Sequence, residues 1–383
     1  MEYVYPEYFY EFRCVGKDCT DTCCQAWEIG IDPVSLRKYR DYPGFFGNRL
    51  RNSIDWRRGV FEQYGGRCAF LNEDNLCDIY TEAGKGMLCK ACTRYPRHYE
   101  EYENLREISL SLSCPEAARM ILGKKEPLRF HRSFRRTPEE EYEIFDLFLF
   151  SRLRRIRRCF FGILQSREIS VGLRLSFLLA LSHDLQPRID RDRYYSADRI
   201  LKKCGNERFL ERAVEKLRRY EGNAAGRAEL LKEMFGRMYR MEALDPGWHG
   251  FLKECSARLC LEAPKEEYGA LCAEFSEYMK EREHEYEQLL VYLIFTYFCG
   301  AVYDRDAFGK VKLAACVFLM TRELGMACWL GNGKVFSFGE QVRLCARLSR
   351  EIEHQACSLD MLEHMLREEQ TFSLEAFLGA VLA

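Results

Sequence analysis

Cysteines are concentrated at the start of this chain, and their thiols are the side chains best suited to chemistry. Nine of the nineteen cysteines lie within the first 114 residues. The spacing C-x4-C-x3-C-C over residues 14–24 lets several sulfurs face one point, and a later C-x2-C pair has the spacing of structural zinc and iron–sulfur sites. We therefore predict a metal or cluster site. Its candidate ligands are Cys14, Cys19, Cys23, Cys24, Cys68, Cys77, Cys89, Cys92 and Cys114.

Two other interpretations of these cysteines stay open. Free cysteine often behaves as a small buried hydrophobic residue, which suits the ten later cysteines, such as Cys159 and Cys299, on apolar stripes. It suits the first nine poorly, because most of them lie among Gly, Asp, Asn, Thr and Lys. A disulfide framework is disfavoured by the chain length, the odd number of cysteines and the lack of a secretory signal. The adjacent Cys23 and Cys24 would also need strain to bridge each other.

Length and composition are those of an ordinary globular protein. The 383 residues suffice for one large or two medium domains, with 47% hydrophobic and 31% charged residues. A net charge of −1 gives no reason to expect nucleic acid as a partner. The first residues are acids and tyrosines, where a signal peptide has a basic start and an apolar run. The apolar run 289–303 is too short to span a membrane. We expect a cytoplasmic protein without a membrane segment, in which thiols stay reduced.

The elements that must position the cysteines are short. Asp32 followed by proline predicts a helix over 33–40, and a second short helix is expected over 45–64. Residues 103–113 alternate apolar and polar side chains, which predicts a strand. The following Cys114 precedes a proline at a predicted helix start, where the helix dipole favours thiolate over thiol.

A small β-hairpin is predicted between these elements. Two short apolar runs flank the polar turn 72–75, with Cys68 on one arm and Cys77 on the other. The basic, irregular stretch 124–138 is expected to be a linker, and Thr137 followed by proline and two glutamates predicts the start of the next helix.

Apolar residues then recur at helical spacing nearly to the end of the chain. We therefore expect a mainly α protein, with an irregular Cys-rich metal-cluster domain over 1–123, the linker, and an α-helical bundle over 139–383. Further helices are predicted near residues 170–185, 207–220, 226–243, 247–261, 267–283, 285–302, 305–329, 336–357 and 359–368.

An arginine-rich run, Arg152 to Arg158, resembles a nucleic-acid patch in composition alone. Acidic residues 139–146 lie just upstream in the same predicted helix. A solvated or partner-facing helix surface is the better interpretation of such a run.

No common catalytic motif is present, whether G-x-G-x-x-G after a strand, P-loop, H-E-x-x-H or G-x-S-x-G. The cysteine motifs, however, resemble those of the flagellin lysine-N-methylase family. The first half is similar to zinc- or iron-chelating cysteine-cluster proteins, although Ala69 replaces a usual proline and the leading spacing is longer. Segments 290–292, 301–304 and 349–354 also look like family segments. The resembling motifs are C-x4-C-x3-C-C, Cys68-Ala-Phe-Leu, Leu76-Cys77-Asp-Ile, Cys89-x2-Cys92-x-Arg94-Tyr95-Pro96-Arg97 and Cys114-Pro115-Glu116-Ala117-Ala118-Arg119.

The resemblance implies methylation of flagellin lysine side chains with S-adenosylmethionine as methyl donor, in an enzyme with a [4Fe–4S] cluster. Arg94, Tyr95 and Arg97 directly follow a ligand cysteine and are candidates for holding the donor's carboxylate or an acidic substrate patch. The spacing C-x3-C-x2-C of radical enzymes is absent. A polar methyl transfer instead needs a neutral amine, and hence a base or a desolvated pocket. The alternative function is an iron–sulfur or zinc module for electron transfer, redox sensing or partner binding without methyl transfer.

The sequence identifies no catalytic residue. Glu116 is a weak candidate for a base, because first-turn glutamates usually favour the helix dipole. Asp304 is expected to cap the following helix. Glu351 and His354 lie three apart on one helix face, which predicts a structural pair. Cys114 fits a ligand or a helix-start cysteine better than a nucleophile.

Overall fold

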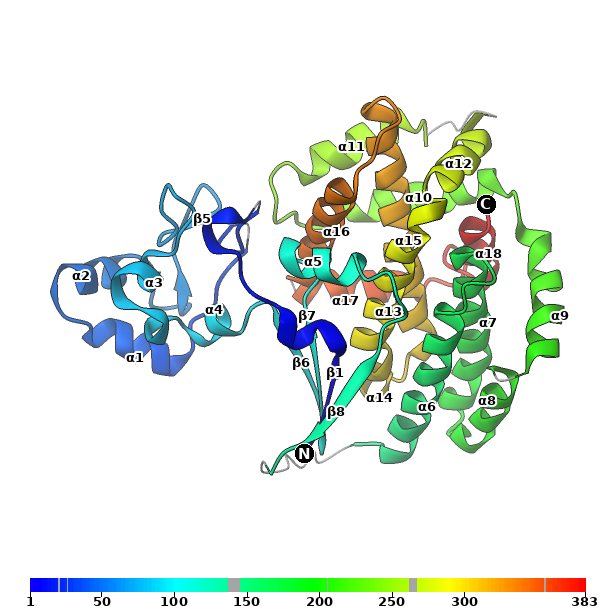
Figure 1. The fold of residues 1–383 in the computed structure, drawn as a ribbon, viewed down its shortest axis with the longest axis horizontal. Helices are drawn as coiled ribbons and strands as arrows, with labels where there is room; N and C mark the ends of the chain where they lie inside the picture. Colours follow the sequence, from blue (N-terminus) through cyan, green and yellow to red (C-terminus); the bar gives the residue numbers. More distant parts are fainter. Residues whose placement is uncertain (20, 26, 137–144, 205, 262–266, 355) are drawn as a thin grey trace.

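A four-stranded sheet joins the N-terminal part of the chain to a large body of helices (Figure 1). Helices dominate this computed structural model and the sheets are small, so the predicted mainly α fold is confirmed. The predicted helix start at Thr137 lies outside the described residues. The structure describes residues 1–383 except 20, 26, 137–144, 205, 262–266 and 355.

The sheet has the strand order β6-β7-β1-β8. β1 pairs in parallel with β7 and antiparallel with β8. Ile108 and Leu110 of β7 are buried in the core shared with the helices, which confirms the predicted strand. The predicted linker 124–138, in contrast, contains β8, whose exposed and mostly polar residues show little strand pattern. The strands are β1 (Glu2–Pro6), β6 (Arg97–Tyr102), β7 (Leu105–Leu110) and β8 (Phe130–Phe134).

Residues 24–92 form a small lobe with its own hydrophobic core, set apart from the helices in Figure 1. Its first helix begins as predicted, because the carboxylate of Asp32 accepts a hydrogen bond from the backbone N–H of Ser35 at 3.0 Å. The second helix ends at Asn52 and not near residue 64, since the chain turns into the pair β2–β3. The lobe contains α1 (Pro33–Asp41), α2 (Gly44–Asn52), β2 (Ile54–Asp55), β3 (Val60–Phe61), β4 (Gln63–Tyr64), β5 (Arg67–Cys68), α3 (Asp78–Ala83) and α4 (Lys90–Arg94).

The predicted hairpin between Cys68 and Cys77 is present only as a turn with one bridge, Leu71 to Cys77. The second arm does not continue as a strand, because α3 begins directly after Cys77. Asp78, the first residue of α3, pairs with Arg49 of α2 at 2.6 Å, which favours the helix at this point.

The helical body contains every helix predicted after residue 170, and α8, α14 and α18 in addition. The apolar run 289–303 begins in α13, in which residues 285–296 are buried. The bounds are α5 (Pro115–Leu122), α6 (Leu147–Leu164), α7 (Val171–Asp190), α8 (Asp198–Cys204), α9 (Glu207–Leu217), α10 (Ala224–Met238), α11 (Trp248–Arg258), α12 (Glu267–Tyr278), α13 (Glu283–Tyr297), α14 (Ala301–Asp304), α15 (Ala307–Gly331), α16 (Phe338–Glu353), α17 (Ala356–Met365) and α18 (Leu374–Val381).

Among the described residues, α15 is the one helix long and apolar enough to cross a membrane by length and composition. Its apolar stretch is 83% buried inside the fold, which is the environment of a core helix.

The arginine-rich run 152–158 is partly internal to the fold, with Arg155 and Arg158 exposed. Arg157 is buried and forms a bidentate ion pair with the carboxylate of Glu107 in β7. Arg154 pairs with Glu2 of β1 at 3.2 Å. The prediction of a solvated face is therefore wrong for Arg157. Its position on the buried stripe of α6 brings it to the sheet.

Candidate functional site

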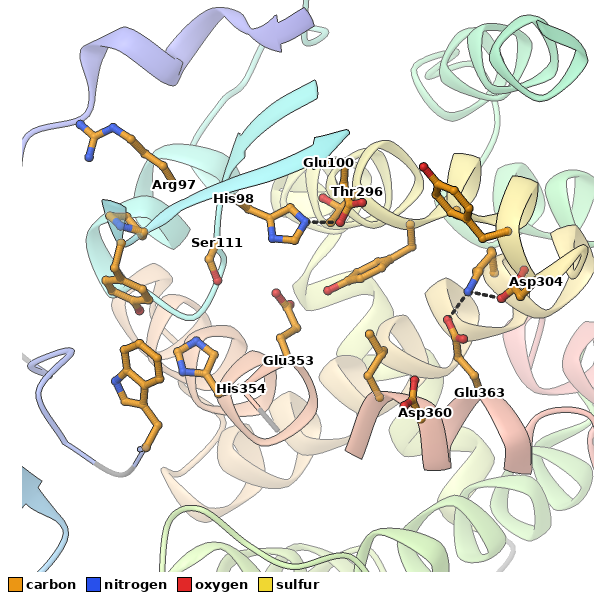
Figure 2. A pocket seen from close by; sticks show the side chains of 18 residues that line it. Arg97, His98, Glu100, Ser111, Thr296, Asp304, Glu353, His354, Asp360 and Glu363 are labelled. Atoms are coloured by element: carbon orange, nitrogen blue, oxygen red, sulfur yellow. Dashed lines mark hydrogen bonds and ion pairs between the residues drawn. The ribbon is translucent and has the colours of Figure 1, made fainter. Parts of the chain in front are cut away.

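A cavity of about 550 Å³ lies where the sheet, the helical body and the small lobe meet. Its walls come from β6, from the C-terminal ends of α13 and α16, from α14, α15 and α17, and from Trp27 of the lobe (Figure 2). Its volume lies within the range of small-molecule sites, roughly 300–1,000 Å³.

Carboxylates outnumber cations among the described side chains that face this cavity. His98 binds Glu100 at 2.7 Å, and the Lys310 ammonium lies 2.6 Å from both Asp304 and Glu363 (Figure 2). Burial opposes the charged form of Lys310, but these two carboxylates hold its pKa above the usual value. This excess of negative charge favours a cationic ligand. The carboxylates are Glu100, Asp304, Glu353, Asp360 and Glu363.

Glu353, the last residue of α16, directs its carboxylate into the cavity (Figure 2). Oε1 accepts a hydrogen bond from Ser349 Oγ at 2.8 Å, and Oε2 accepts one from the Tyr292 hydroxyl at 3.0 Å. The Tyr297 hydroxyl donates a third. Burial raises the pKa of Glu353, and these hydrogen bonds and nearby His98 offset only part of the shift.

His354, which follows Glu353, is an uncharged imidazole at neutral pH. Its ring packs against Trp27 and Tyr95, with ring centroids 4.7 and 5.8 Å apart, and its Nε2 lies 2.7 Å from Ser113 Oγ. Burial, followed by the charge of Arg350, lowers the pKa of His354 to about 4.

Two buried polar atoms of the cavity wall have no hydrogen-bond partner within the described part of the chain. They are Nδ1 of His354 and Oγ1 of Thr296. Both atoms are closed off from solvent, so they do not by themselves indicate a ligand.

Ser113 connects the cavity to the cysteine-rich segment. Its hydroxyl lies 3.0 Å from the Tyr95 hydroxyl and 2.7 Å from the ring of His354. Its carbonyl accepts a hydrogen bond from Arg350 at 3.0 Å. The same arginine pairs with Asp21, between Cys19 and Cys23, at 2.6 Å. Arg350 therefore ties the loop that carries the first cysteines to the wall of the cavity.

The residues predicted to bind the methyl donor are only partly at this site. Tyr95 lies in the cavity wall. Arg97 also belongs to the wall, but its guanidinium points away from the other lining side chains, over the ring of Phe12 at 5.6 Å (Figure 2). Arg94 is exposed and stacks on Tyr99 at 5.3 Å.

The weaker candidates have mostly structural partners. Glu116 pairs with Arg119 at 2.6 Å. Glu351 accepts hydrogen bonds from the backbone N–H groups of Leu244 and Asp245, both at 2.9 Å, so the predicted pair with His354 is wrong.

Asp304 binds Lys310 and does not cap α15, because Asp306 is the N-cap residue of that helix.

The sequence interpretation assigned no role to Lys310, Glu353 or Arg350. Glu353 and Arg350 lie in segment 349–354, and the resemblance of this segment to the family is the sequence feature that could have identified them.

The nine predicted ligand cysteines lie in two neighbourhoods. The Cys68 backbone N–H binds the Cys24 carbonyl at 2.9 Å, and these two belong to the lobe group. The thiols of adjacent Cys23 and Cys24 hydrogen-bond each other, so this pair joins the two groups. The lobe group is Cys24, Cys68, Cys77, Cys89 and Cys92. The junction group is Cys14, Cys19, Cys23 and Cys114.

No three Cys, His, Asp or Glu side chains among the described residues are arranged to hold one metal ion. The nine predicted ligand cysteines form no disulfide among the described residues, and hydrogen bonds from Cys23 and Cys92 lower the pKa values of Cys24 and Cys89 to about 7. Cysteine sulfurs that could bind a metal are therefore present in contacting pairs. The Cys-rich metal-cluster domain is not confirmed, and its ligand set stays a prediction.

Cys114 is the N-cap residue of α5, with proline at the next position, as predicted. Burial nevertheless raises the pKa of this thiol to about 11, so desolvation outweighs the backbone N–H groups at the helix start.

The comparison with family models concerns the helical body. A family model described as the FliB lysine N-methylase C-terminal domain matches residues 157–380. The flagellar biosynthetic protein FliU of Salmonella muenchen is 29% identical over 148 residues, which are 34% of this chain and 88% of that protein. Lysine-N-methylases of Salmonella typhimurium (strain LT2) and Salmonella choleraesuis (strain SC-B67) are 30% identical over 127 residues, 31% of this chain and 32% of theirs. The match thus spans about a third of the length of these methylases. No solved structure matches the chain.

Proposed function

This chain belongs to the FliB lysine N-methylase family, and from that premise we propose that it methylates lysine side chains of flagellin, with S-adenosylmethionine as methyl donor. The relatives support lysine methylation and a link to the flagellum, since they are lysine-N-methylases and a flagellar biosynthetic protein. A cytoplasmic location and flagellin as protein partner belong to this proposal.

The observation that carries the proposal is the acidic cavity at the end of α16. A lysine side chain is an apolar stem with a cationic tip, and this cavity offers matching surfaces. Trp27, Tyr95 and Tyr297 provide aromatic walls, and Glu353 and Asp360 have no ion-pair partner among the described residues. Aromatic faces and carboxylates together bind ammonium groups well.

We further propose that the N-terminal cysteines hold an iron–sulfur cluster, with zinc as the alternative metal. Free thiols in two neighbourhoods support a soft metal or cluster. The described arrangement holds these thiols in pairs and not around one point, so no step of methyl transfer is assigned to the cluster.

The proposal is tested with protein purified under anaerobic, reducing conditions. Incubation with flagellin and S-adenosylmethionine is expected to add methyl groups to lysine residues, detected by mass spectrometry of the digested flagellin. Samples without enzyme or without donor are the controls. If protein that retains its metal adds no methyl group, the proposed activity is refuted.

The second candidate is an iron–sulfur or zinc module that carries electrons, senses redox state or binds a partner. The lobe group of cysteines favours it, because these thiols lie in a core separate from the cavity. Iron and acid-labile sulfide without methyl transfer would support the module. A colourless zinc protein that methylates lysine would overturn the iron–sulfur proposal alone.

A further inference from the structure

We propose that Glu353 is the general base that removes a proton from the substrate's lysine ammonium. This inference rests on the proposed lysine methylation, which the cavity and the family support. It concerns a specific residue and a specific proton, and no other part of the proposed function depends on it.

The geometry of Glu353 is that of a positioned acceptor. Ser349 and Tyr292 each donate to one of its oxygens, at 2.8 and 3.0 Å, and Tyr297 donates as well. A carboxylate has about four acceptor positions, so at least one stays available to a ligand. The carboxylate faces the cavity, at the end of a helix whose last turn is packed in the core (Figure 2).

The other acidic side chains of the cavity are less suited to this role. Glu100 is occupied by His98, and Asp304 and Glu363 by Lys310. The oxygens of these carboxylates already bind a cationic side chain, so they are less available to a proton of the substrate.

Asp360 and His354 are also poorer candidates than Glu353. Asp360 is exposed, so water solvates its carboxylate. His354 already uses Nε2 toward Ser113, and with a pKa of about 4 its ring accepts a proton poorly. Glu353 is half-buried and forms no ion pair among the described residues, although the charge of His98 lies near it.

Groups from four neighbouring elements surround Glu353. His98 and Glu100 approach from β6, the hydroxyls of Tyr292 and Tyr297 from α13, Lys310 from α15 and Asp360 from α17. His354 is the neighbour on its own helix, and is neutral. Burial of an ammonium–carboxylate pair disfavours both charges, which lowers the lysine pKa and raises that of the carboxyl group.

The reaction balances without a further reactant. An N–H bond of the substrate ammonium breaks, its proton passes to Glu353, and the electron pair stays on the lysine nitrogen. That pair forms the new N–CH3 bond as the sulfonium donor's S–CH3 bond breaks, and the bonding electrons leave with sulfur. The proton on Glu353 then passes to solvent, which restores the carboxylate.

The test compares Glu353→Gln with Glu351→Gln on the same helix. Glu351 faces away from the cavity and binds only backbone N–H groups of Leu244 and Asp245 among the described residues. We expect Glu353→Gln to lower kcat by roughly 100-fold or more, with a rate that keeps rising with pH. Glu351→Gln should keep the wild-type pH profile. If Glu353→Gln keeps the wild-type kcat and pH profile, the proposal is wrong.

Two milder variants test the proposal even if Glu353→Gln does not fold. Ser349→Ala removes a hydrogen bond that stabilises the carboxylate, so the acid limb of the kcat profile should move to higher pH. Asp360→Asn removes charge from the same cavity and should raise KM while kcat is kept. An acid limb that does not move in Ser349→Ala contradicts the proposal. Wild-type protein that methylates no lysine refutes the proposed function, and this inference with it.

Discussion

At the scale of single residues, the neutral ring of His354 links stability to pH. Its pKa in the folded protein is about 4, and the ordinary value is about 6.5. Above pH 6.5 the ring is neutral in both the folded and unfolded states. Between pH 6.5 and 4 the unfolded chain binds a proton that the folded protein does not, so the free energy of unfolding falls as the pH is lowered.

We predict that this fall amounts to up to roughly 3 kcal/mol between pH 6.5 and 4, and that His354→Gln removes it. The measurement is urea unfolding at several pH values for wild type and variant. His131→Gln, at an exposed position on β8, is the control and should keep the wild-type slope. Equal slopes for wild type and His354→Gln would contradict the assignment.

The cysteines give a second prediction at this scale. Serine in place of a metal-ligating cysteine should lower the bound iron and acid-labile sulfide per chain, because the hydroxyl is a poor ligand for iron. Cys24→Ser tests the lobe group and Cys114→Ser the junction group, with exposed Cys260→Ser as the control. Loss of metal in only one group identifies where the centre lies, and full metal content in both contradicts the proposed ligand set.

At the scale of elements, a buried ion pair connects α6 to the sheet. Arg157 binds Glu107 of β7 and also donates to the carbonyl of Phe295 in α13 at 2.8 Å. Arg157→Met should lower the free energy of unfolding by about 3–5 kcal/mol, since it leaves a buried carboxylate without its partner. Neighbouring Arg158 is exposed, and Arg158→Met should change stability by less than about 0.5 kcal/mol. Chemical denaturation of both variants checks this, and similar losses for the two would argue against a special role of the buried pair.

The elements also differ in how well the sequence predicts them. Helices of the body bury one wide apolar face, so their periodicity is visible in the sequence. β8 has no such pattern, because it forms where β1 offers an open edge and most of its side chains remain exposed. The turn after Leu71 is predictable from its polar residues, whereas the helix that begins at Asp78 also pairs with Arg49, nearly thirty residues earlier.

At the scale of the whole molecule, Arg350 connects the cysteine-bearing loop to the helical body. We predict that Arg350→Met speeds backbone hydrogen exchange in residues 14–24, because the contacts to Asp21 and to the carbonyl of Ser113 are lost. Mass spectrometry of exchanged peptides checks this. Arg343→Met, at an exposed position on the same helix, should leave exchange unchanged. Unchanged exchange in Arg350→Met would show that the loop is held by other contacts.

The cavity itself was not predictable from local sequence patterns. Glu353, Lys310 and His98 are more than forty residues apart from one another along the chain and meet only because α15, α16 and β6 pack together. Their spacing carries no motif, and a charged residue near a helix end is ordinary in any soluble protein. Resemblance to a family located two of the segments, but only the packing shows which side chains share a cavity.

The position of β1 in the sheet has a consequence for synthesis on the ribosome. β1 pairs with β7 and β8, which are translated about a hundred residues later, so the first strand has no partner while the lobe is being made. The lobe, residues 24–92, has a core built from its own residues. It is therefore able to collapse first, as a loop between two ends that pair when β7 emerges, before β8 completes the sheet. Chaperones that shield short aromatic segments would act on β1 during this interval.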